Sequence, residues 1–241
     1  MRFLPFLVML LPAGAMATQG RDMGTIEGRV TFAGQPPEMP EQPRFLPSGQ
    51  PRDPACATHE KQRWVLVTDG GVADVVVRLP ATAAKTPPPA ALAVIDQKDC
   101  VYLPRVLPVV TGQKVAFRNS DPTMHNLHAH LPDGSVDFNE AQPRGFPDKL
   151  ASISAPPGDK PYRVTCDVHP WMESFLVVSD HSYAAVTRSD GRFQLFVPVG
   201  TYELQAWHPN LGQKTVKVKV LPGKVVVAKF PEYRPEDYRA P

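Results

Sequence analysis

The chain has 241 residues, with 26 Lys and Arg against 24 Asp and Glu, and its net charge of +2 provides no strong attraction to nucleic acid or to an anionic membrane. Its 29 prolines and recurrent valine-rich runs, without long amphipathic helical stretches, favour short strands joined by turns. The composition therefore predicts an all-β protein, and the length allows one large β domain or two smaller ones.

The first 17 residues have the pattern of a secretory signal peptide. Arg2 precedes an apolar stretch over residues 3–11, and Ala15-Met16-Ala17 offers small residues where signal peptidase cleaves. The apolar stretch is too short for a stable membrane anchor, and no later segment has a transmembrane pattern. We therefore expect cleavage after Ala17 and a periplasmic or secreted protein without stable membrane insertion.

Strand patterns divide the remaining chain into an N-terminal part, a central part and a C-terminal part. In the N-terminal part, residues 24–80, we expect strands at 24–32, 63–68 and 72–79. A Pro-rich linker follows at 81–91. In the C-terminal part, residues 181–230, valine-rich strands and a Ser-Asp-Gly turn are predicted, and residues 231–241 form a tail.

The central part, residues 92–180, contains a second set of predicted strands. They cover residues 93–95, 106–110, 114–118, 162–166 and 175–178. Residues 119–161 between them are rich in Pro, Gly and Asp and are expected to be long and irregular. The carboxylates of Asp121, Asp137 and Glu140 in this stretch are expected to be solvated or to form turns.

Four residues of the central part form a pattern typical of a metal site. His125 follows a predicted strand, and Cys166, His169 and Met172 lie in one seven-residue loop between two predicted strands. Two imidazoles, a thiolate and a weak axial thioether are the ligands of a blue-copper electron-transfer site. Zinc is the alternative metal, but a methionine ligand argues against it. Cys-x-x-Cys-His, the attachment motif of c-type haem, is absent from the sequence.

The pattern resembles the cupredoxins, with a ligand loop of the amicyanin type because Pro170 directly follows the histidine. The resemblance implies a Greek-key β-sandwich, one type 1 copper ion and one-electron transfer with a transient protein partner. It also implies that Asn126 hydrogen-bonds toward the ligand loop and fixes it. The segment 131–149 departs from the pattern as a long insertion that could cover the copper end.

The flanking parts resemble a second family, the carboxypeptidase regulatory-like (transthyretin-like) domains. The resemblance rests on the Asp190-Gly191 turn, on the Pro-x-Gly-Thr-Tyr turn over 198–202, and on residues 24–30, which are similar to a first strand. It implies a second, smaller β-sandwich without catalytic residues. Because its two parts flank residues 92–180, the copper segment could be inserted within it.

Three cysteines are present. In an oxidising compartment two of them are expected to form a disulfide, and the presence of an unpaired third cysteine needs an explanation. Metal binding supplies that explanation for Cys166, so a Cys56–Cys100 disulfide is expected.

The imidazole edge of His169 is expected to reach the surface. Trp171 would form part of a small electron-transfer docking surface there, or else it packs inward beneath the 131–149 segment. His128 and His130 are expected on one strand face, opposite His125, as loop or surface residues or as a secondary metal site.

Three functions remain open on the sequence alone. The first is an electron-transfer protein, the second a copper chaperone or storage protein with the same ligands, and the third a non-redox β-sandwich binding module. The sequence contains none of the motifs of serine hydrolases, P-loop enzymes, dinucleotide-binding enzymes or zinc proteases, so an enzyme is not expected.

Overall fold

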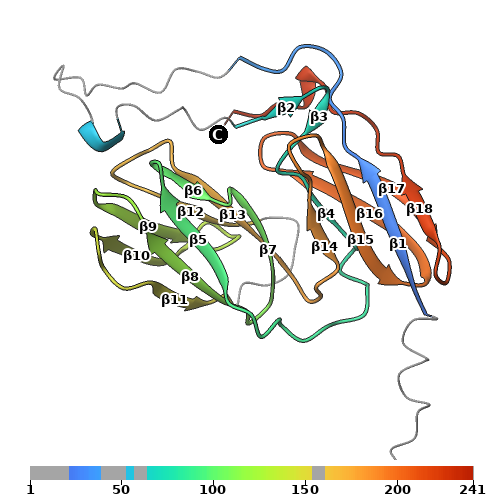
Figure 1. Cartoon of the computed structure of the whole chain (residues 1–241), viewed down its shortest axis with the longest axis horizontal. Helices are drawn as coiled ribbons and strands as arrows, with labels where there is room; N and C mark the ends of the chain where they lie inside the picture. The colour runs from blue at the N-terminus through green and yellow to red at the C-terminus, as the bar shows by residue number, and fades with distance from the viewer. Residues whose placement is uncertain (1–21, 39–52, 57–63, 154–160, 241) are drawn as a thin grey trace, which may run out of the picture.

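In the part of the chain that the structure describes, nearly every regular element is a β-strand, which confirms the all-β prediction. The computed structural model describes residues 22–38, 53–56, 64–153 and 161–240. Within these ranges the strands form two lobes, and two short 3-10 helices accompany them (Figure 1). None of the described helices has the length and apolar character needed to cross a membrane. The predicted signal peptide lies outside the described residues.

The lobe that holds the candidate metal residues is a sandwich of two sheets. A five-stranded sheet has the order β10-β9-β12-β13-β7 and a four-stranded sheet has the order β11-β8-β5-β6. In chain order these strands are β5 (Ala93–Lys98), β6 (Val101–Leu103), β7 (Val106–Val110), β8 (Lys114–Asn119), β9 (His125–His130), β10 (Val136–Gln142), β11 (Lys149–Ser152), β12 (Tyr162–Thr165) and β13 (Glu173–Ser179). Alternate residues of both sheets point inward and share one buried apolar cluster, which includes Ile95, Phe117, Leu127, Val164 and Leu176.

The other lobe takes its strands from both ends of the chain. Sheets of order β15-β1-β18 and β14-β4-β16-β17 enclose a second core, which includes Ile26, Val77, Leu195, Leu204 and Val218. The strands are β1 (Met23–Arg29), β4 (Val76–Arg78), β14 (Ala184–Val186), β15 (Arg192–Pro198), β16 (Gly200–His208), β17 (Gly212–Val220) and β18 (Val225–Ala228). β2 (Val67–Thr68) and β3 (Gly71–Val72) form a small hairpin, and η1 (Pro54–Cys56) and η2 (Pro235–Asp237) are the two 3-10 helices.

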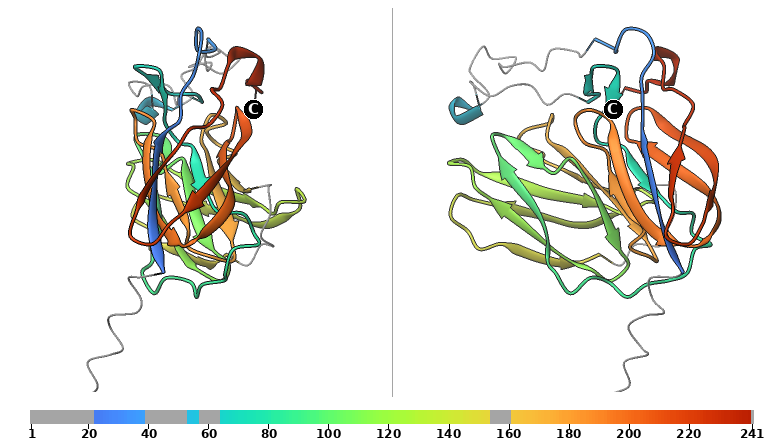
Figure 2. Two further views of the ribbon diagram at one scale, coloured as in Figure 1. Left: turned by 90° about the vertical axis from the view of Figure 1, so that its right-hand side faces the viewer. Right: turned by 45° about the vertical axis from the view of Figure 1, so that its right-hand side comes forward.

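The two lobes share a buried contact. β4 and β14 pair antiparallel, so the chain leaves the second sandwich after β4 and returns beside it (Figure 2). Every residue of β13 is buried, because one face packs into the first sandwich and the other packs against the second one. Phe175 on that outer face meets Trp207 of β16 with ring centroids 6.0 Å apart. The sequence of a strand that is buried on both faces is typically a continuous run of apolar residues.

Three sequence expectations about these elements were wrong. Residues 119–161 are not irregular, because β9, β10 and β11 lie within them. β9 alternates polar and apolar residues from Asn126 to His130, but only Leu127 and Ala129 are apolar, and β10 is an exposed edge strand without apolar alternation. The predicted strand 72–79 is broken at Asp74, whose φ is 58°. The expected tail is partly core, since Tyr233 is fully buried and donates a hydrogen bond to the Ala206 carbonyl.

Candidate metal centre

The structure brings His125, Cys166 and His169 together at one end of the first sandwich. His125 begins β9, Cys166 directly follows the neighbouring strand β12, and His169 lies in the loop that leads to β13. The two imidazole Nδ1 atoms are 2.8 Å apart, and Sγ of Cys166 lies 3.7 Å from Nδ1 of His169. All three side chains are buried, so three metal-ligating atoms converge away from solvent.

Met172 lies on the inner side of the same loop. It is fully buried and belongs to the same apolar cluster as Cys166. Its backbone N–H donates to the His169 carbonyl at 2.9 Å, and its own carbonyl accepts from the Cys166 N–H at 3.3 Å. The loop therefore closes on itself between two paired strands, which restricts the motion of the residues that it carries.

Asn126 ties β9 to this loop, and the hydrogen bonds expected of it are present. Its side-chain oxygen accepts from the Asp167 N–H at 2.5 Å, and its own backbone N–H points at Sγ of Cys166, 3.4 Å away. Its amide nitrogen donates to Asn139 of β10 at 2.6 Å. The segment 131–149 thus supplies an edge strand that supports the loop network.

Each histidine of the trio has a carboxylate on its outer nitrogen. Nε2 of His125 lies 2.8 Å from Asp121, and Nε2 of His169 lies 3.2 Å from Asp53. Sequence reasoning missed both contacts: Asp121 was expected to be solvated but is 6% exposed, and Asp53 lies 116 residues from its histidine. The spacing of Asp121, four residues before His125, was the only local signal.

The disulfide Cys56–Cys100 forms as expected, with the two Cα atoms 5.7 Å apart. It brings the short segment Asp53–Cys56, drawn in cyan in Figure 1, over the ligand loop, so that Sγ of Cys56 lies 3.6 Å from Nε2 of His169. The expectation that the His169 edge reaches the surface was therefore wrong, because the side chain is fully buried beneath this segment.

Trp171 is half-buried and faces the disulfide rather than the 131–149 segment. Its Nε1–H donates to the Cys100 carbonyl at 2.9 Å, and its ring centroid is 5.1 Å from that of His169. The indole therefore forms one wall around the imidazole. A role of Trp171 in docking an electron-transfer partner stays a prediction.

Burial determines the protonation preferences of the trio. Burial lowers the pKa of His125 and of His169, although the neighbouring carboxylates oppose the shift, so both imidazoles favour the neutral form that binds metals. Burial raises the pKa of the Cys166 thiol, and the Asn126 N–H partly offsets it. A metal ion that binds there must displace the thiol proton.

The donor set fits a soft, singly or doubly charged metal ion such as copper. If each Nε2–H donates to its carboxylate, the two Nδ1 lone pairs face each other at 2.8 Å and repel unless a proton or a cation lies between them. Imidazole, thiolate and thioether are ligand types that copper accepts. Asp121 and Asp53 contact the Nε2 atoms of the two histidines, so we do not count their carboxylates among the potential metal ligands.

His128 and His130 lie on the opposite face of β9 from His125, as the alternation predicted. Their rings stack at 4.2 Å between centroids, and Nδ1 of His128 lies 2.8 Å from Asp167. Among the described residues, neither histidine belongs to a group of three metal-ligating side chains close enough to share an ion. They are half-buried strand residues rather than loop residues.

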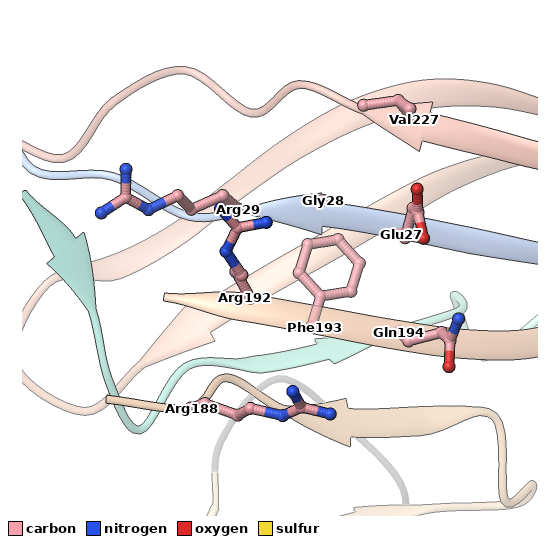
Figure 3. Close-up of a pocket in the computed structure, with 8 residues that line it drawn as sticks. All are labelled: Glu27, Gly28, Arg29, Arg188, Arg192, Phe193, Gln194 and Val227. Carbon is pink, nitrogen blue, oxygen red and sulfur yellow. The ribbon is translucent and has the colours of Figure 1, made fainter. Parts of the chain in front are cut away.

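A separate hollow of about 420 Å³ lies on the second sandwich, away from the trio (Figure 3). Its lining includes three arginines, but two of them already bind turn residues of the same lobe. Arg29 donates to the carbonyls of Asp190 and Asp69, and Arg192 pairs with the Asp190 carboxylate at 3.3 Å. The hollow is therefore assigned no ligand. Its walls are Glu27, Gly28, Arg29, Arg188, Arg192, Phe193, Gln194 and Val227.

No protein-family model and no curated protein matches the chain. Parts of it are similar to solved structures. A purple cupredoxin from Nitrosopumilus maritimus is 23% identical, with 36% of this chain and 99% of that one covered and a TM-score of 0.30. Amicyanin from Paracoccus versutus is 19% identical, with coverages of 44% and 99% and a TM-score of 0.32. A copper-containing nitrite reductase from Thermus scotoductus is 22% identical, with coverages of 42% and 26% and a TM-score of 0.28. Likenesses this weak assign no function to the chain.

Proposed function

We propose that this protein binds one copper ion through His125, Cys166, His169 and Met172 and carries single electrons between protein partners outside the cytoplasm. The observation that supports it most is the convergence of two imidazoles and one unpaired, buried thiol in a water-excluded site. Bound copper would supply the one-electron redox couple, since soft sulfur ligands suit Cu(I) and imidazole suits both oxidation states.

The rest of the chain is proposed to keep the ligand geometry fixed. The loop closes on itself through its backbone hydrogen bonds, and Asn126 ties it to β9. Ligands held on paired strands move little when the charge of the ion changes, which favours fast electron exchange.

Residues 24–80 and 181–230 are proposed to form one carboxypeptidase regulatory-like sandwich, with residues 92–180 inserted as the copper domain. The antiparallel pairing of Val76 with Val186, just before and just after the insertion, supports this division. The second sandwich would serve as a scaffold without catalytic residues. Export to the periplasm or beyond is supported by the N-terminal pattern and by the disulfide, which persists in oxidising compartments.

Copper storage is the second candidate. Complete burial of His169 beneath the Asp53–Cys56 segment favours it, because no imidazole edge is open to an incoming electron donor. Storage would use the same ligands but would not require rapid cycling between oxidation states.

Protein-film voltammetry of the copper-loaded full chain separates the two candidates. An electron carrier gives a reversible one-electron wave that persists over repeated cycles without loss of metal. A storage protein gives a sluggish or irreversible wave and holds Cu(I) preferentially, and that result would contradict electron transfer. Zinc-loaded protein, which has no accessible redox couple, is the matched blank.

A further inference from the structure

Each imidazole of the trio contacts a carboxylate through Nε2, on the side of the ring away from Nδ1. One of the two carboxylates comes from outside the sandwich. Asp121 lies in the loop just before β9, four residues from its partner His125. Asp53 comes from the segment before the disulfide, 116 residues from His169 in the chain. The second contact therefore exists only because the chain folds back over the site.

Asp53 is held in place by several independent contacts. Its Oδ2 accepts a hydrogen bond from the Thr123 hydroxyl at 2.6 Å, and its Oδ1 accepts from the Ala55 N–H at 2.8 Å. Three residues later, Cys56 is bonded to Cys100. The Cys100 N–H in turn donates to Asp121 at 2.9 Å, so the two carboxylates lie on either side of one disulfide.

We propose that Asp53 is a positioning residue for the copper site, which orients His169 through Nε2 and biases the bound ion toward its oxidised state. The inference rests on the proposed copper function and goes beyond it, because it assigns the redox preference of the site to a segment outside the ligand loops. The disulfide Cys56–Cys100 is the anchor that delivers the carboxylate.

The physical reason lies in the charge and in the hydrogen bond. An ionised carboxylate accepts a hydrogen bond from Nε2–H, so the Nδ1 lone pair is directed toward the thiol and the imidazole becomes a stronger electron-pair donor to a metal ion. The negative charge also stabilises Cu(II) more than Cu(I), and burial keeps solvent from screening this interaction. The Asp53 side chain is 16% exposed and that of His169 is fully buried.

The test is the reduction potential of the copper-loaded full chain with Asp53→Asn, which keeps the size of the side chain and removes its charge. Mutation of a residue that hydrogen-bonds the outer nitrogen of a ligand histidine costs about 10–100-fold in metal affinity. If the affinity for Cu(II) falls by this factor and the affinity for Cu(I) does not, the reduction potential rises by about 60–120 mV, since each tenfold change corresponds to 59 mV in a one-electron couple. Asp53→Glu keeps the carboxylate and should restore most of the wild-type potential.

Asp180→Asn is the matched control. It removes the same charge from an ion pair with Lys85 at the far end of β13, about 20 Å along the strand from the ligand loop. Equal potentials for Asp53→Asn and Asp180→Asn would overturn the inference. Asp53→Ser replaces the asparagine variant if that variant does not fold, with the same expected rise.

Failure of the inference differs from failure of the proposed function. If the wild-type protein forms no thiolate–Cu(II) absorption band, the copper function is wrong and the inference falls with it. If the wild-type band is present and the potential of Asp53→Asn is unchanged, only the role of Asp53 is contradicted.

Discussion

The residues of the candidate metal site form an inner layer of potential metal ligands and an outer layer of carboxylates. Nδ1 of each imidazole faces inward, toward the thiol of Cys166, and Nε2 of each faces a carboxylate. The inner layer could be predicted from residue types and spacing, because a thiol, an imidazole and a thioether share one short loop. The outer layer could not, because the spacing of Asp53 and His169 in the sequence carries no information about contact across 116 residues.

Met172→Leu tests the fourth proposed ligand. Leucine keeps the buried volume of the loop, so the fold and the thiolate–Cu(II) colour should be retained. The loss of the thioether removes a weak donor that favours Cu(II), so the reduction potential should rise. Voltammetry of the copper-loaded variant beside wild type measures the change. A potential equal to that of wild type would show that Met172 is a core residue and not a ligand.

Among the elements, the Asp53–Cys56 segment and its disulfide have the largest expected effect. Cys56 and Cys100 are 44 residues apart, and closing a loop of that length stabilises by about 4 kcal/mol in the chain-entropy model. We expect the double variant Cys56→Ser, Cys100→Ser to lose up to that amount in urea unfolding of the copper-free chain. Its copper-loaded form should also show the raised potential expected for Asp53→Asn.

Two outcomes would contradict this role of the disulfide. Unchanged stability would mean that the bond adds no constraint to the unfolded chain. Reduced stability with an unchanged potential would mean that the segment stays over His169 without its anchor. Mass mapping of the wild type under non-reducing conditions, with Cys166 as the single free thiol, is the control.

Strand prediction succeeded where a strand has a run of apolar residues and failed where it does not. β7, although an edge strand, was predicted with its observed ends, Val106 and Val110, because its apolar residues are buried or half-buried. β10 was missed because an edge strand with most of its residues exposed has no apolar period. The apolar alternation that identifies a strand is produced by burial, so it weakens where burial does.

At the scale of the whole molecule, a buried polar network joins the two sandwiches next to the ligand loop. Arg105 pairs with Glu173 at 2.7 Å and donates to Asn210 of the second sandwich at the same distance. Glu173 directly follows Met172, so the proposed ligand loop is tied to the scaffold. Sequence reasoning could not foresee the network, because isolated charged residues are usually solvated.

His208 lies beside this network and makes the stability of the fold depend on pH. It is fully buried, its Nδ1 accepts from the Asn210 N–H, and its Nε2 has no hydrogen-bond partner in the described chain. Burial, and then the charge of Arg105, hold the pKa of His208 well below its ordinary value of 6.5. The folded protein therefore keeps this imidazole neutral in a pH range where the unfolded chain binds a proton.

Stability should consequently fall as the pH drops below 6.5. Proton binding by the unfolded chain alone lowers the free energy of unfolding with a slope that approaches about 1.4 kcal/mol per pH unit, or by about 1.6 kcal/mol in all between pH 6.5 and 5. His208→Gln should flatten this part of the dependence in urea unfolding of the copper-free chain. His128→Gln, on the outer face of β9, is the matched control, and an identical slope in the His208→Gln variant and wild type would exclude His208 as the cause.

The visible absorption of the protein on titration with Cu(II), with Cys166→Ser beside the wild type, tests the proposed copper site most directly. Serine matches the shape of cysteine but is neither soft nor readily deprotonated, so it cannot supply the thiolate. We expect the wild type to develop an intense thiolate–Cu(II) charge-transfer band that saturates at one equivalent and the variant to stay without it. A wild type that binds no Cu(II) or stays colourless, or a Cys166→Ser variant that keeps the band, would contradict the assignment.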